Sequence, residues 1–164
     1  MPVPIVRAAW RYLMDSGALT DLVGPTIGTD ATWPAGWVFA GDRDGNPFRA
    51  AEGTGKVSVV LFSNDHWSAP GHNHTAQFPL LRVNIFADPD RDAGGQPTKH
   101  NAEDKAQAVY DRIRPLFHDA ANRVSRFDDL PIISTVEGSS LGLFGVPEGD
   151  GTVMGVATYE IALH

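Results

Sequence analysis

Two stretches of the chain repeat apolar residues at helical spacing. Near the start, the positions that recur every three or four residues are Ile5, Val6, Ala9, Trp10 and Leu13. Over 102–117, an apolar stripe faces away from the charged positions and consists of Ala102, Ala106, Val109, Tyr110, Ile113, Leu116 and Phe117. Asn101 is expected to cap the second helix, and Pro115 is expected to kink or end it because proline removes a backbone hydrogen bond.

Four other stretches have the pattern of β-strands, namely 56–62, 80–86, 131–138 and 152–164. A further short strand is predicted at 37–39, inside a segment rich in glycine and proline. Two connections are long: a histidine-containing loop joins the first pair of strands, and the glycine-rich 139–151 is predicted to be a loop between the last pair. This order predicts an α+β fold, with a mainly antiparallel sheet of about four strands, helices packed on one face, and long loops.

Length and composition narrow the classes of protein that this chain can be. With 164 residues and no linker, it is predicted to form a single domain, 1–164. The net charge is -7 and the basic residues are scattered, which argues against a nucleic-acid binder and against binding to an anionic membrane surface. The absence of cysteine excludes disulfides, thiolate nucleophiles and zinc–thiolate sites. No segment is apolar over the length that a bilayer requires.

The stretch EGTGKVSVV resembles a phosphate-binding loop but does not match the sequence pattern of such loops. Ala50 stands where the first glycine is required, and Val57 stands where serine or threonine should follow the lysine. The stretch also leads into a predicted strand, whereas a phosphate loop opens a helix whose N-terminus holds the anion. We interpret it as a turn before a strand.

The stretch DPDRDAGGQPTK places Asp88, Asp90 and Asp92 in alternation, as a calcium-binding loop does. The glycine required at the sixth position is Ala93, and the bidentate glutamate required at the twelfth is Lys99. We therefore interpret the stretch as a solvated acidic turn.

The stretch NDHWSAPGHNH is the chain's one constellation that could hold a catalytic metal. His72 and His74 would point to the same side of an extended segment, and His66 or Asp65 could complete three ligands with one position open. A metal-dependent hydrolase built on His66, His72 and His74 is therefore one alternative. The other is an interface loop, in which Trp67 contacts a neighbouring subunit. We favour the interface and predict neither a catalytic residue, nor a bound metal, nor a cofactor.

Taken in order, the elements resemble the tail terminator proteins of long-tailed bacteriophages. The resemblance rests on the N-terminal helix, the stretch LTDLVGPTIG, the strand KVSVVLF, the strand LLRVNIFAD, the helix NAEDKAQAVYDRIRPLF and the closing strand VMGVATYEIALH. It extends over nearly the whole chain, although the histidine loop and the loop at 138–152 are larger than the pattern requires.

The resemblance implies a structural protein of the virion without enzymatic activity. Such proteins form a ring, a hexamer in that family, on the head-proximal end of the tail tube. The ring ends polymerisation of the tube protein and joins the tail to the head–tail connector protein, and DNA is only cargo that passes through its lumen. Assembly takes place in the bacterial cytoplasm. Another neck component, a head-closure or tail-completion protein, is the alternative within the virion.

Loops of a ring subunit are the expected places for contact with its neighbours and partners. The aromatic, apolar and histidine residues in the predicted loops are therefore the interface candidates: Trp33, Trp37, Trp67, His72, His74, Leu143 and Phe144. Packing within the subunit is the alternative for each of them. The predicted polar face of the sheet carries Arg82, Asn84, Thr158 and Glu160. Three alternatives are left for what this face contacts: solvent, the lumen of the ring, or a neighbouring subunit.

Overall fold

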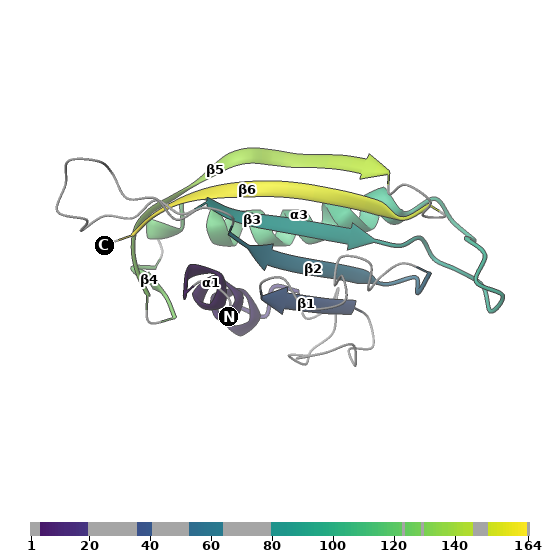
Figure 1. Ribbon diagram of the computed structural model, residues 1–164, viewed down its shortest axis with the longest axis horizontal. Helices are drawn as coiled ribbons and strands as arrows, with labels where there is room; N and C mark the ends of the chain where they lie inside the picture. The colour runs from purple at the N-terminus through teal and green to yellow at the C-terminus, as the bar shows by residue number, and fades with distance from the viewer. Residues whose placement is uncertain are drawn as a thin grey trace.

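The computed structural model describes residues 4–19, 36–40, 53–63, 80–122, 124–128, 130–145 and 151–163. Its helices are α1 (Pro4–Asp15), α3 (Ala102–Phe117) and the short 3₁₀ helix η2 (Ala120–Asn122). Its strands are β1 (Gly36–Ala40), β2 (Val57–Phe62), β3 (Leu80–Ala87), β4 (Arg126–Phe127), β5 (Leu130–Gly145) and β6 (Val153–Leu163). Figure 1 shows the strands side by side in one curved sheet, with the helices packed against it.

The sheet has six strands in the order β1-β2-β3-β6-β5-β4. Every neighbouring pair is antiparallel except β1 and β2, which are parallel. The α+β class and the mainly antiparallel sheet agree with the sequence prediction, while about four strands was too few. Of the two strands beyond these four, β1 was predicted as the short strand at 37–39, and the two-residue β4 is too short to leave a pattern in the sequence.

β5 is much longer than predicted, because it continues through the glycine-rich stretch that was expected to be a loop. It pairs with β6 as far as Gly145, which lies opposite Val153. Three shifts of register interrupt the pairing between Ile132 and Gly142, as expected where extra residues bulge out of one strand. The prediction that Leu143 and Phe144 lie in a loop was therefore wrong: both belong to β5.

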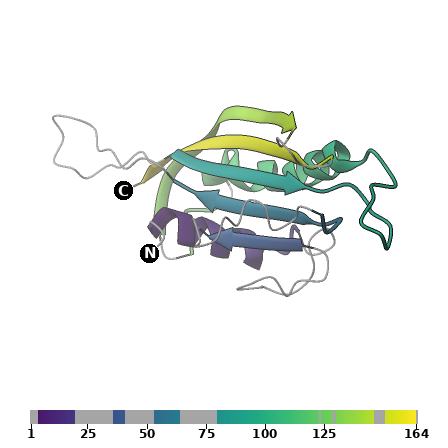
Figure 2. The ribbon, with the colours of Figure 1, turned by 45° about the vertical axis from the view of Figure 1, so that its right-hand side comes forward.

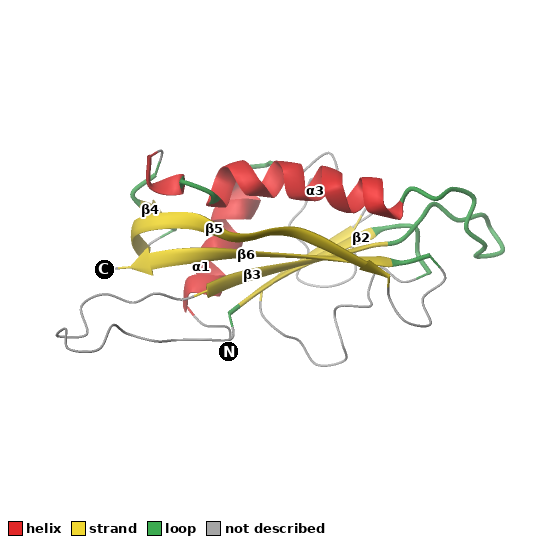
Figure 3. Ribbon diagram, turned by 90° about the horizontal axis from the view of Figure 1, so that it is seen from above, coloured by secondary structure: helices red, strands yellow, loops and turns green. Residues whose placement is uncertain are grey.

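α1 and α3 pack on the same face of the sheet, as predicted. Figure 3 shows α3 lying along one side of β5, β6 and β3. The stripe of α3 is buried except for Leu116, which is partly buried and packs against the same core. Pro115 does not end the helix, which continues to Phe117. α1 reaches the other edge of the sheet, where the Trp10 indole N–H donates to the Val38 carbonyl at 3.1 Å.

Four aromatic rings join these layers at the centre of the core. Phe117 of α3 contacts Tyr159 of β6 and Phe127 of β4, with ring centroids 5.6 and 5.5 Å apart. Tyr12 of α1 stacks on Phe127 at 4.7 Å. Phe117, Phe127 and Tyr159 have no exposed surface, so this cluster holds both helices and two strands together.

The connection between β3 and α3, residues 88–101, extends beyond the end of the sheet. Figure 2 shows it as the teal loop that projects past the strands. It turns through Asp92, whose carboxylate accepts the backbone N–H groups of Gly94 and Gln96, both at 2.9 Å. This loop brings a group of charged side chains to the N-terminal end of α3.

Candidate functional site

Most of the residues predicted to form a site lie outside the described part of the chain. These are Trp33, Trp67, His66, His72 and His74. Trp37 lies in β1, for which only the backbone and Val38 are described. The predicted roles of these residues, as interface residues or as metal ligands, stay predictions. Within the described ranges, no three acidic or histidine side chains come together as metal ligands would.

Leu143 and Phe144 lie near the end of β5 and differ in exposure. Leu143 is half-buried, and its side chain would be 3.4 Å from a Cβ placed on Gly155 of β6. Phe144 is 55% exposed. The described large apolar residues that are similarly exposed are Ile133 (45%) and Val136 (48%), both also in β5. Among the described residues, the exposed large apolar side chains therefore all belong to this one strand.

The polar face of the sheet is only partly open to solvent. Asn84 is 4% exposed, and the Arg82 guanidinium lies 5.3 Å from the centre of the Phe62 ring. Thr158 exchanges a hydrogen bond of 2.8 Å with Ser139, and Glu160 is exposed. The open part of this face therefore lies toward β5 and β6.

One polar cluster centres on Asp88, at the end of β3. Its carboxylate has no exposed surface, and it accepts two hydrogen bonds from the Arg91 guanidinium, at 2.6 and 2.8 Å. It also accepts the Gly55 N–H and the Thr152 hydroxyl, both at 2.7 Å. The turn before β2 and the start of β6 are thus tied to the end of β3. The interpretation of this stretch as a solvated turn was therefore wrong for Asp88, whereas residues 92–96 are exposed as predicted.

Burial and hydrogen bonding shift the pKa of Asp88 in opposite directions. Burial raises the pKa, because it removes the charged form from water. The hydrogen bonds from Arg91, Gly55 and Thr152 stabilise the carboxylate and together outweigh burial, so the pKa lies below its usual value. With its oxygen atoms taken up by internal donors, Asp88 serves as a structural link rather than as a base or a metal ligand.

A second group of charges fixes the start of α3 beside this cluster. The Lys105 ammonium donates to the Gly55 and Asp88 carbonyls at 2.8 and 3.0 Å, and pairs with Asp90 at 2.7 Å. The Lys105 hydrogen bond is the main cause that lowers the pKa of Asp90. Asn101 stands at the N-cap but makes no capping hydrogen bond, because its side-chain oxygen accepts the Asp90 N–H at 3.0 Å.

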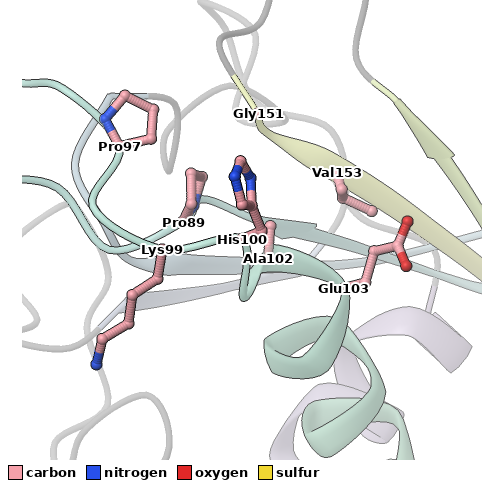
Figure 4. A pocket seen from close by; sticks show the side chains of 8 residues that line it. All are labelled: Pro89, Pro97, Lys99, His100, Ala102, Glu103, Gly151 and Val153. Carbon is pink, nitrogen blue, oxygen red and sulfur yellow. The ribbon is translucent and has the colours of Figure 1, made fainter.

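A pocket of about 370 Å³ lies at this end of the molecule. Its lining residues are Pro89, Pro97, Lys99, His100, Ala102, Glu103, Gly151 and Val153 (Figure 4). Figure 4 shows Glu103 beside Val153, and the Lys99 side chain pointing away from the other labelled side chains. Lys99 instead approaches Asp90, at 3.5 Å. The lining therefore does not form a set of converging groups for acid–base or nucleophilic catalysis.

A third polar cluster joins α3 to β5. The Tyr110 hydroxyl donates a hydrogen bond to the Glu137 carboxylate, which also pairs with Arg114 at 3.2 Å. Burial, followed by the hydrogen bond to Glu137, raises the pKa of Tyr110 to about 12. The hydroxyl of Tyr159 is buried nearby without a hydrogen-bond partner, and burial raises its pKa as well. These contacts hold β5 against the helix.

Comparisons with known proteins identify a shared fold. No family model matches the chain, and no curated protein matches it. The chain is similar to a solved chain from "Virion of native gene transfer agent (GTA) particle", with 10% sequence identity and a TM-score of 0.55. The similarity covers 97% of this chain and 93% of the other. No helix in the described ranges is long and apolar enough to cross a membrane. This similarity shows that the two chains share a fold.

Proposed function

We propose that this chain is a structural protein of a phage-like virion. The observation that carries the proposal is the fold, which is shared over 97% of the chain with a chain of a gene transfer agent virion. Two features of the site support it. The polar clusters are occupied by internal partners, and the exposed apolar side chains gather on one strand, as an assembly subunit requires.

Within the virion, the role that fits best is that of the tail terminator. The order of helix, strands, helix and strands supports this role, as does the compact sheet with long connections. In this role, copies of the chain form a ring on the head-proximal end of the tail tube. The ring stops addition of tube protein and contacts the connector on its other side. Each subunit then presents two different surfaces to its neighbours in the ring.

The mass of the purified protein in solution tests the structural role against the hydrolase. We expect light scattering to detect rings, or monomers that form rings as the concentration rises, with the same mass in the presence of a chelator. The contrary result is a monomer that holds stoichiometric zinc and loses it when His72 and His74 are replaced by alanine. That result would favour the metal-dependent hydrolase.

A further inference from the structure

The pocket at the N-terminal end of α3 has walls that are mostly apolar. Pro89 and Ala102 are buried, and Pro97 and Val153 are partly buried. In Figure 4, the His100 ring stands between Pro89 on one side and Val153 on the other. The volume of about 370 Å³ lies in the range of ligand sites in proteins. These walls offer flat rings and aliphatic surface to a bound group.

Contacts between the end of β3 and the start of β6 fix these walls. Gly151 lies against Pro89, since a Cβ atom on this glycine would be 3.1 Å from the proline ring. The next residue, Thr152, donates its hydroxyl to the buried Asp88 carboxylate at 2.7 Å, and Asp88 directly precedes Pro89. A pocket that is already formed costs little free energy of ordering when a ligand binds.

The free charge in the pocket is the carboxylate of Glu103. The Lys99 side chain points away from the other lining side chains and approaches Asp90 at 3.5 Å. Glu103 lies beside Val153, and it has no hydrogen bond or ion pair among the residues that the structure describes. A carboxylate next to apolar walls selects a ligand that carries a positive charge and hydrogen-bond donors.

The helix N-terminus does not make this pocket a site for anions. The dipole of a helix favours negative charge at its N-terminus, and Glu103 and Asp104 already supply it in the first turn of α3. The net charge of -7 also attracts cations and repels anions. For this pocket, the same net charge favours a basic segment of a different protein over a second copy of the chain.

Arginine is the side chain that matches both parts of the pocket. Its guanidinium is planar, stacks on ring faces and pairs with a carboxylate through two parallel hydrogen bonds. Its aliphatic stem packs on apolar surface while the charged end stays at the rim. The pocket lies where the connection 88–101 projects past the strands (Figure 2), so a large partner can reach it.

We propose that this pocket binds an arginine side chain from a basic segment of a different protein. The guanidinium pairs with Glu103, and the stem packs against Val153 and Ala102. The inference goes beyond the proposed function, because it names the chemistry of a partner, and it does not depend on that function.

Short peptides test the site on the wild-type protein. The probes are acetyl-Gly-Arg-Gly-amide and the same peptide with citrulline, which has nearly the shape of arginine but no charge. In NMR titrations, we expect the arginine peptide to shift the amide signals of His100, Ala102 and Val153. It should bind about threefold or more tightly than the citrulline peptide, as expected for one partly exposed ion pair. A lysine peptide should also bind more weakly, because it cannot form the paired hydrogen bonds.

The variant Glu103→Gln removes the charge from the pocket. Asp104→Asn is the matched control, because it removes the same charge from the same helical turn but lies outside the lining. Both side chains are exposed, so neither change disturbs the core. We expect Glu103→Gln to weaken binding of the arginine peptide about threefold or more and to leave binding of the citrulline peptide unchanged. Asp104→Asn should bind both peptides nearly as the wild type does.

Equal binding of the arginine peptide and either other peptide to the wild type would overturn the inference, as would equal losses for the two variants. A third contrary result is a change in the mass of the protein in light scattering for Glu103→Gln but not for Asp104→Asn. The pocket would then contact a second copy instead of a different protein. In each of these cases the proposed virion role still stands.

Discussion

Replacing Asp88 with alanine is expected to lower the free energy of unfolding by about 3–5 kcal/mol. The reason is the partner left behind: the Arg91 side chain is only 7% exposed and would be a buried cation without its carboxylate. The Gly55 N–H and the Thr152 hydroxyl would lose the same acceptor. Chemical denaturation followed by circular dichroism measures the change.

Arg11→Ala is the matched control, because it removes an ion pair that is exposed. The Arg11 and Asp128 side chains are 48% and 31% exposed, and their 2.9 Å contact is expected to contribute less than about 1 kcal/mol. In the Asp88→Ala background, replacing Arg91 with methionine should restore part of the loss, since the variant then no longer buries a guanidinium that has lost its carboxylate. A loss below about 1 kcal/mol for Asp88→Ala would show that the cluster does not hold these strands together.

The lowered pKa of Asp88 also sets a direction for stability against pH. Because the folded state holds this carboxyl below its usual pKa of 3.8, its contribution is fully present above that value. It is lost as the pH falls through the lower pKa of the folded state. Acid unfolding of the wild type should therefore be steeper below about pH 4 than that of Asp88→Ala.

Phe117→Ala is expected to lower the free energy of unfolding by about 3–5 kcal/mol as well, for a different reason. Phe117 has no exposed surface and contacts aromatic rings from α1, β4 and β6. Removing the ring leaves a cavity where two helices meet the sheet, and these elements cannot close it without moving apart. Thermal and chemical denaturation both report the loss.

Tyr159→Phe is the control within the same aromatic cluster. It keeps the ring that contacts Phe117 and removes only a buried hydroxyl that has no hydrogen-bond partner. Since burying an unpaired polar group costs free energy, this variant should be as stable as wild type or slightly more stable. A large loss for Tyr159→Phe, or a small one for Phe117→Ala, would contradict this description of the core.

The sequence predicts well those elements in which buried residues recur at the regular spacing of a helix or a strand. The stripe of α3 packs on the core at every predicted position, and β6 buries Ala157, Tyr159, Ile161 and Leu163 on one face. β2 shows the limit of this reasoning. Every residue from Val57 to Leu61 is buried, so the burial of this strand, which lies between β1 and β3, does not alternate.

The end of β5 was predicted to be a loop because glycine is unfavourable in strands and common in turns. The pairing with β6 outweighs this preference. Gly155 of β6 has no side chain, which leaves room for the side chains of Leu141 and Leu143. Asp88 was assigned to a solvated turn for a similar reason. Its local sequence is that of a polar turn, and its partners Gly55 and Thr152 come from distant parts of the chain. No local pattern carries such information.

Electron microscopy of tail tubes tests the central claim most directly. Purified protein would be added during polymerisation of the tube protein from the same particle, and the length and ends of the tubes would be measured. The account predicts that tubes stop growing, with a ring of this protein at one end, and that their mean length falls as its concentration rises. Tubes of unchanged length with bare ends would contradict the terminator role.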